Sequence, residues 1–279
     1  MTKSKNIKIG VIGFGNMARA IFRQALTKKI IHPQNILSLA HHPAHDQKLK
    51  SKLGITICPD MSNLARQSQI ILLAVKPGQM QAVLKDLKPH YHKQLVLTVA
   101  AGIPVKIYQK ILGRTSPVMR LMPNMPTTLG LGVTTFYCSP PVSPAQKKAA
   151  LHLLRETGLV FELKQEKLLE PAMTVAGSGP AFVYRYALAV AEAGHKLGLS
   201  KKTSLELTLR TMLGSIHMLE ETNLDPEKLI AQVTSKGGTT LAGLSVLDKM
   251  NFNGMMLECL KAARQRSSEI GHEITKEMS

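Results

Sequence analysis

Short apolar segments alternate with amphipathic helical patterns along the first 165 or so residues of the chain. Apolar segments this short are typical of buried strands, and the patterns between them have the spacing of a helix face. The predicted strands are Ile7–Ile12, Asn35–Leu39, Ile55–Ile57, Gln69–Val75, Leu95–Val99, Val118–Met122, Gly132–Tyr137 and Val160–Leu163. The predicted helices run to about Thr27 after the first strand, then near Ala44–Lys52, Asn63–Gln67, Gln79–Leu87 and Pro144–Thr157. This order predicts an α/β fold with a Rossmann-like, doubly wound and mostly parallel sheet.

After about Glu166 the strand signal ends and long helical patterns follow. They cover Pro180–Leu197, Lys202–Glu221, Leu241–Lys249 and Gly254–Glu269. At 279 residues the chain is long enough for two domains. We therefore expect a Rossmann-like domain at residues 1–165 and an all-α domain at 166–279.

Composition indicates an ordinary globular protein. Hydrophobic residues make up 44% of the chain and charged residues 19%, which excludes a disordered polypeptide. No apolar run approaches the roughly 20 residues that span a bilayer, and no secretory segment precedes the first strand. Cys58, Cys138 and Cys259 lie far apart without paired or metal-binding spacing, so reduced thiols in the cytoplasm are the simplest interpretation.

The formal net charge of +18 raises the hypothesis of a nucleic-acid partner. However, the 36 Lys and Arg residues are spread along the whole chain, and aromatic residues make up only 4%, so a base-stacking platform is poorly supplied. A basic field can also steer anionic cofactors and substrates. We therefore expect neither a nucleic-acid partner nor a membrane.

The turn after the first strand fits the dinucleotide fingerprint Gly13-x-Gly15-x-x-Ala18. The first glycine permits the tight turn, the second lets a pyrophosphate approach the backbone, and the small Ala18 allows close helix–strand packing. The strand–turn–helix context favours a cofactor role over a simple packing turn. The residues that we expect to contact the dinucleotide here are Ile12, Gly13, Phe14, Gly15, Asn16 and Met17.

The end of the second strand favours NADPH over NADH. An NAD site usually has an acid there, whereas this chain continues with Ala40, His41 and His42 and has no acid before Asp46. Ala40 and His41 are expected near the adenosine phosphate, and a protonated His41 or His42 would bind it more tightly. Alternatively, these histidines are exposed turn residues. A metal site is the least favoured interpretation because no carboxylates support the histidines.

Two further strands end in small residues. The fourth predicted strand is followed by Lys76 and Pro77, and the fifth by Gly102. Ligands of open α/β sheets bind beyond the carboxyl ends of strands near the point where the strand order reverses. The residues predicted to contact the cofactor at these ends are Ala74, Val75, Lys76, Pro77, Val99, Ala100 and Ala101.

A polar segment, Val233–Thr240, precedes the helical pattern that begins near Leu241. Its Gly237 and Gly238 allow close approach of a ligand to the backbone, and the N–H groups at a helix start attract an anion such as a carboxylate. Taken alone, the segment could equally be a loop with a helix cap. Together with a nucleotide signature at the other end of the chain, it is a candidate substrate site.

Six motifs resemble, in order, those of pyrroline-5-carboxylate reductases. They are Gly13–Ala18, Ala74–Pro77, Ala100–Ile103, Arg120–Pro126, Gly177–Phe182 and Thr234–Thr240, and the resemblance extends from about residue 6 to about 270. It implies NAD(P)H-dependent reduction of Δ1-pyrroline-5-carboxylate to L-proline, the last step of proline biosynthesis. It also implies that the helical domain interlocks with its copy in a homodimer, and family members often assemble into a homodecamer.

The same resemblance implies how the site works. The Thr240 hydroxyl is expected to bind the ring nitrogen of the substrate and to act in catalysis, while backbone N–H groups at Gly238–Thr240 hold its carboxylate. The residues expected to bind the substrate are Glu166, Ser235, Gly238, Thr239 and Thr240. Gln232 is expected to reach the cofactor. Arg120 is either a clamp on the substrate carboxylate or a structural residue that binds backbone carbonyls.

This chain also departs from the family pattern. Lys236 replaces a usual Pro, Met125 replaces Thr, and Met61 replaces an Asn that commonly contacts the nucleotide. The alternative within enzymes is a β-hydroxyacid or ketopantoate-type reductase, but Lys196 lacks the motif that surrounds the catalytic Lys of those enzymes. The alternative of another class, a cofactor-binding or nucleic-acid-associated protein without catalysis, is supported only by the high charge.

Overall fold

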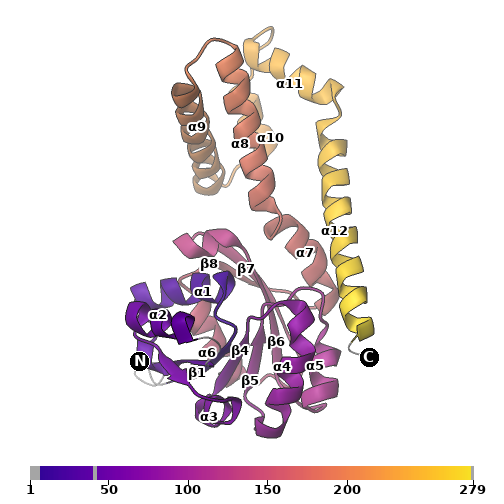
Figure 1. Cartoon of the computed structure of the whole chain (residues 1–279). Coiled ribbons are helices and arrows are strands. Elements are labelled where there is room, and N and C mark those ends of the chain that lie inside the picture. The colour runs from indigo at the N-terminus through magenta and orange to yellow at the C-terminus, as the bar shows by residue number, and fades with distance from the viewer. Residues whose placement is uncertain (1–6, 40–42, 278–279) are drawn as a thin grey trace. The chain divides into compact units, whose positions relative to one another are not determined.

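A computed structural model of the chain describes residues 7–39 and 43–277 (Figure 1). Its first part is organised by a sheet with the strand order β3-β2-β1-β4-β5-β6-β7-β8. The strands are β1 (Ile9–Ile12), β2 (Ile36–Leu39), β3 (Thr56–Cys58), β4 (Ile70–Leu73), β5 (Leu95–Thr98), β6 (Val118–Pro123), β7 (Gly132–Cys138) and β8 (Gly158–Glu162). Neighbouring strands are parallel except β6 and β7, which pair antiparallel. The prediction of a doubly wound, mostly parallel sheet is confirmed.

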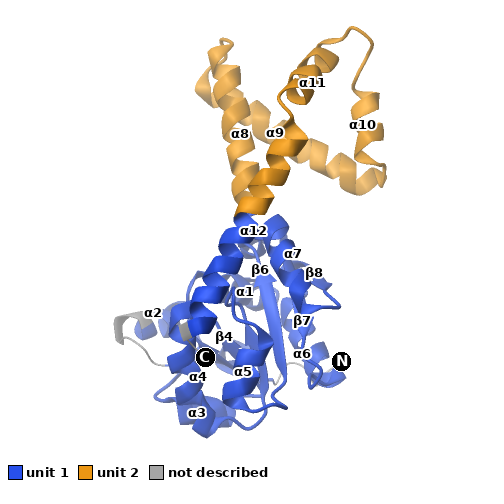
Figure 2. Ribbon diagram, turned by 90° about the vertical axis from the view of Figure 1, so that its right-hand side faces the viewer, with its two compact units in different colours: residues 1–178, 263–279 blue, residues 179–262 orange. Residues whose placement is uncertain are grey.

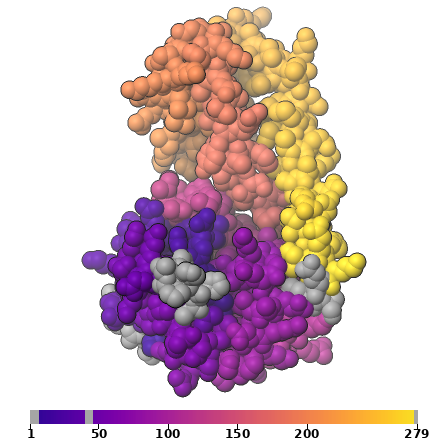
Figure 3. All heavy atoms as spheres, in the orientation of Figure 1, coloured from indigo at the N-terminus to yellow at the C-terminus, as the bar shows by residue number. Residues whose placement is uncertain are grey.

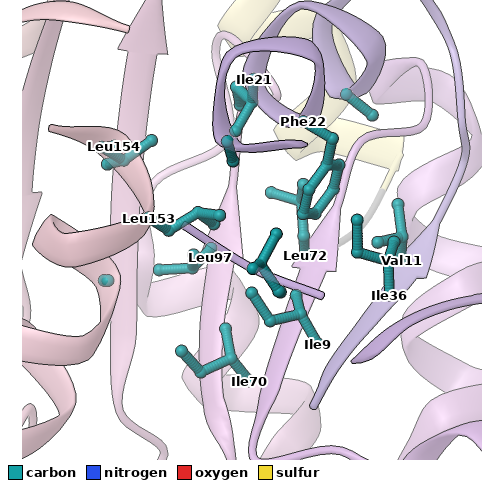
Figure 4. Close-up of a cluster of buried hydrophobic side chains, with 14 of the residues drawn as sticks. Ile9, Val11, Ile21, Phe22, Ile36, Ile70, Leu72, Leu97, Leu153 and Leu154 are labelled. Carbon is teal, nitrogen blue, oxygen red and sulfur yellow. The ribbon is translucent and has the colours of Figure 1, made fainter. Parts of the chain in front are cut away.

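The central strands β1, β4 and β5 are almost entirely apolar and fully buried because both faces of the sheet are covered there. Ile9 and Val11 of β1 point into one core, whereas Ile12 points into the other. Figure 4 shows the first core, where Phe22 of α1 and Leu153 of α6 meet the strands. The helices that connect the strands are α1 (Asn16–Thr27), α2 (Pro43–Leu53), α3 (Met61–Gln67), α4 (Met80–Leu87), α5 (Val105–Leu112) and α6 (Pro144–Leu154). A further helix, α7 (Leu169–Ala176), follows the last strand.

The remaining elements are all helical, as predicted. They are α8 (Gly179–Lys196), α9 (Lys201–Thr222), α10 (Pro226–Gln232), α11 (Thr239–Lys249) and α12 (Phe252–Glu277). α8 and α9 pack through small residues, and the Ser204 hydroxyl donates a hydrogen bond of 2.7 Å to the Ala191 carbonyl oxygen. The sequence did not predict the short helices α5, α7 and α10.

The chain divides into two compact units, coloured separately in Figure 2. The first holds the residues up to Ser178 together with those from Ala263 onward, and the second holds Gly179–Ala262. The last strand ends at Glu162, but the compact first unit also includes α7 and the last turns of α12. The functional division at residue 165 stays a prediction. No helix among residues 7–39 and 43–277 is long and apolar enough to cross a membrane.

Candidate active site

The turn between β1 and α1 requires glycine for two independent reasons. Gly13 has φ +89°, and a Cβ atom on it would lie 2.8 Å from the carbonyl oxygen of Ala74. The Ala74 amide in turn donates a hydrogen bond of 2.8 Å to the Ile12 carbonyl oxygen, so the ends of β1 and β4 lie against each other. β1 is the strand where the sheet order reverses. The Gly13 turn therefore lies where open α/β sheets bind nucleotides.

The start of α1 presents backbone N–H groups to a ligand. Gly15 is the N-cap residue, no side chain caps the helix, and its first turn contains no acid. A Cβ atom on Gly15 would meet no atom within 4 Å, so the backbone faces open space. An uncapped helix start without acids fits a pyrophosphate group. Ala18 is fully buried, as close packing of the helix on the strand requires.

Phe14 contributes differently from its neighbours in the fingerprint. Its side chain is only 5% exposed and stacks on Phe22 with ring centroids 5.6 Å apart. Only the backbone of Phe14 is therefore available to a ligand. Asn16 is exposed and Met17 is half-buried, so both side chains can reach solvent at the helix start. Ala40, His41 and His42 lie outside the described residues, and their contact with the adenosine phosphate stays a prediction.

The residues after β4 differ in exposure. Ala74 and Val75 are half-buried beside Gly13, whereas Lys76 is exposed and precedes a short 3₁₀ turn that begins at Pro77. Met61, at the position where the family usually has Asn, is 5% exposed and joins the second core. Its side chain is therefore not available to a nucleotide.

Residues 99–104, between β5 and α5, are held at the β5 end by a buried hydroxyl. Thr98 Oγ1 accepts a hydrogen bond of 3.3 Å from the Ala100 amide and lies 2.8 Å from the Tyr108 hydroxyl. Burial raises the pKa of Tyr108 to about 12, although the hydrogen bond to Thr98 acts in the opposite direction. The phenol therefore stays protonated at neutral pH and keeps this contact.

The α5 end of the same segment is held by Glu166. Its Oε1 accepts a hydrogen bond of 2.7 Å from the Val105 amide, in the first turn of α5, and one of 2.5 Å from Arg120 Nη1. The Arg120 side chain is 9% exposed and that of Glu166 is 27% exposed. Arg120 thus binds a carboxylate of the protein, where a backbone carbonyl was the expected structural partner, and the alternative of a clamp on the substrate carboxylate stays a prediction. These contacts favour a role for Glu166 in shaping the segment, while its contact with substrate stays a prediction.

A cavity of about 960 Å³ adjoins this ion pair within the first unit. Its walls come from the segment after β5, from β6, from α7 and from the last turns of α12, with Arg120, Glu166 and His272 among the lining residues. The sequence did not reveal this cavity because its walls are far apart along the chain. Among the described residues, no group of three or more His, Cys, Asp or Glu side chains is arranged to hold a metal ion.

In the second unit, the Val233–Thr240 segment leads into a second uncapped helix start. Gly237 has φ +76°, Gly238 is the N-cap of α11, and neither a side-chain cap nor an acid is present in the first turn. The Gly238 amide donates a hydrogen bond of 3.0 Å to the Ser235 carbonyl oxygen, which closes the turn. Thr239, Thr240 and Gln232 are exposed. The start of α11 therefore offers backbone N–H groups and two hydroxyls to an anionic ligand.

Comparison with known proteins covers both units. The model of the family described as "Pyrroline-5-carboxylate reductase dimerisation" matches residues 166–270, and the one described as "NADP oxidoreductase coenzyme F420-dependent" matches residues 8–102. A pyrroline-5-carboxylate reductase of Aquifex aeolicus is 34% identical over 95% of this chain and 97% of its own length. The chain belongs to the pyrroline-5-carboxylate reductase family. This membership confirms the resemblance and disfavours the ketopantoate-type alternative.

Solved structures of the pyrroline-5-carboxylate reductase family also match almost the whole chain. The enzyme of Coxiella burnetii is 33% identical, with a TM-score of 0.88, over 95% of this chain and 98% of that one. The Plasmodium falciparum pyrroline carboxylate reductase with NADP bound is 28% identical, with a TM-score of 0.86, over 96% of this chain and 99% of that one. Both units therefore have the fold of this reductase family.

Proposed function

We propose that the protein reduces Δ1-pyrroline-5-carboxylate to L-proline, the last step of proline biosynthesis, with NADPH as the preferred coenzyme and NADH as a second. The observation that carries this proposal is the match to pyrroline-5-carboxylate reductases along almost the full length of the chain. Two uncapped helix starts, one in each unit, supply the anion sites that such a reaction needs.

The residues present fit a dinucleotide. The open backbone at Gly15 and the first turn of α1 would hold the pyrophosphate, and the residues after β4 and β5 would border the nicotinamide end. The coenzyme supplies a hydride when bound. The protein chain provides binding and orientation, which can contribute on the order of 7 kcal/mol to lowering a barrier. Preference for NADPH is supported by the absence of an acid between Leu39 and Asp46 and by the net charge of +18.

The start of α11 is proposed to hold the substrate. The backbone N–H groups of Thr239 and Thr240 would bind the carboxylate, because the Gly238 amide already donates to the Ser235 carbonyl oxygen and closes the turn that presents them. The Thr240 hydroxyl would hydrogen-bond the ring nitrogen of the substrate and relay its proton. Thr239 would lie next to the substrate carboxylate. Gln232, at the end of α10, is proposed to reach toward the coenzyme.

We also propose that the second unit forms a homodimer and that dimers assemble into a decamer. Within the fully described residues 179–262, only Ala187, Ala191, Ser204 and Thr208 are buried. Large apolar side chains remain exposed on several helices, among them Tyr184, Leu188, Leu209, Leu213 and Ile216. A unit with so small a core of its own is expected to bury these side chains against a second copy. A cytoplasmic location is supported by three cysteines that form no disulfide.

The test is the oxidation of NADPH by purified protein in the presence of racemic pyrroline-5-carboxylate, run beside NADH. We expect turnover that depends on the imine and a lower KM for NADPH than for NADH. No turnover with either coenzyme at neutral pH would overturn the reductase proposal, whereas a lower KM for NADH would overturn only the coenzyme preference. Light scattering tests the assembly, and a fully active monomer of 30.5 kDa would contradict it.

A further inference from the structure

Two glycines from distant parts of the chain touch through their backbones in the first unit. A Cβ atom on Gly102 would lie 2.8 Å from Gly271 Cα, and one on Gly271 would lie 3.0 Å from the Gly102 carbonyl oxygen. Gly102 follows β5 and has φ +77°, while Gly271 lies in α12. Figure 3 shows the last turns of α12 (yellow) packed on their neighbours. Neither residue can carry a side chain unless one backbone moves.

Gly271 lies inside a helix, where glycine is an unfavourable residue. A glycine in a helix interior costs about 1 kcal/mol relative to alanine, so its presence there needs a reason. The contact with Gly102 supplies one, because only a helix surface without a side chain can lie this close to the loop. Ile274, which lies on the same side of the helix, packs against the core cluster that contains Ala100 and Ile103.

The loop that meets Gly271 is the segment 99–104. The Ala100 amide donates to the Thr98 hydroxyl, which also contacts Tyr108, and the helix that follows the segment is capped by Glu166. α12 lies directly on the middle of the segment, at Gly102. α12 therefore supports the part of the loop between its two fixed ends.

We propose that Gly271 is a positioning residue for the coenzyme: by admitting α12 against Gly102, it sets the backbone of the segment 99–104 that borders the nicotinamide end. This inference rests on the proposed function, which places the coenzyme beside Val99, Ala100 and Ala101. Gly271 itself acts through the loop. A methyl group at this position pushes on backbone atoms, which cannot move aside as the end of a flexible side chain would.

The test compares the whole coenzyme with its adenosine half. Fluorescence titration measures the Kd of NADPH, and competition measures the Kd of adenosine 2′,5′-bisphosphate, for the wild type and for Gly271→Ala. We expect Gly271→Ala to raise the Kd of NADPH about fivefold or more while the Kd of the adenosine fragment changes less than about twofold, because the Gly13–Met17 turn is untouched. The KM for NADPH in the reductase assay rises in parallel.

Glu273→Ala is the matched control. It places alanine two residues further along α12, at a side chain that is 63% exposed, and leaves both Kd values unchanged. Ile274→Ala is the second variant, which adds no atoms and loosens the same helix end. We expect Ile274→Ala to raise the Kd of NADPH more than the Kd of the adenosine fragment as well. This variant takes the place of Gly271→Ala in the test if Gly271→Ala does not fold.

Each outcome bears on the proposal. An unchanged NADPH affinity in Gly271→Ala, or an equal weakening of NADPH and the adenosine fragment, would overturn it, since the second result indicates only a less stable domain. Binding of NADPH by a wild-type protein that does not reduce pyrroline-5-carboxylate would overturn the proposed function and leave the positioning role standing. A wild type that does not bind NADPH would overturn both.

Discussion

Replacing Glu166 by alanine tests how the segment between β5 and α5 is held. The substitution removes two hydrogen bonds accepted by Oε1, one from the Arg120 guanidinium and one from the Val105 amide. A hydrogen bond to a charged group contributes about 1.5–3 kcal/mol, and loss of a helix cap costs about 1 kcal/mol. Water can reach Glu166, which is 27% exposed, so the lower end of the range applies to the ion pair. We expect Glu166→Ala to lower the free energy of unfolding by roughly 2.5 kcal/mol.

Glu166→Gln separates the two contributions. Its amide oxygen can still accept from Val105, so only the charge is lost and the expected cost is about 1.5 kcal/mol. Equilibrium unfolding in urea measures both variants. A double-mutant cycle with Arg120→Met isolates the pair, because it subtracts what each side chain contributes apart from the other. If the free energy of unfolding of Glu166→Ala lies within about 0.5 kcal/mol of the wild-type value, this carboxylate does not stabilise the segment.

Three other predictions follow from the site and its surroundings. Thr240→Val should lower kcat about ten- to hundredfold with little change in NADPH affinity; Thr239→Val, the control, acts mainly on the KM for substrate, and a wild-type kcat in folded Thr240→Val would remove the catalytic role. Gly13→Ala should abolish NADPH binding in a fluorescence titration, because alanine is strained at φ +89° and clashes with Ala74; wild-type affinity would contradict this. The pKa of Tyr108 is raised to about 12, above its unfolded value near 10, so its contribution to stability is complete below pH 10 and lost between pH 10 and 12. Ultraviolet titration should therefore show less phenolate gained above pH 11 in Tyr108→Phe than in the wild type, and an equal gain would refute the assignment.

The features that the sequence predicts well are those with local causes. Gly13 and Gly15 fall on a strand–turn–helix junction whose backbone geometry only glycine satisfies, and the short apolar strands reflect burial on both faces. The start of α11 could also be predicted, since Gly237 and Gly238 immediately precede an apolar helical pattern. These signals lie within a few residues of one another.

The contacts that shape the site come from distant segments and leave no local signal. Glu166 meets residues 46 and 61 positions away along the chain, so its sequence context gives no indication of the ion pair with Arg120. Gly271 lies just beyond the predicted helical pattern Gly254–Glu269, and the reason for a glycine there becomes visible only when Gly102 is seen against it.

The central claim is that hydride passes from NADPH to the imine carbon of pyrroline-5-carboxylate. The most direct measurement incubates the enzyme with that substrate and NADPH deuterated at C4 of the nicotinamide, with the 4R and 4S forms in separate reactions, and analyses the product by mass spectrometry. We predict L-proline that carries one deuterium, at the former imine carbon, from one of the two forms and none from the other. Coenzyme oxidation that yields no proline, or proline without deuterium from either form, would contradict the account.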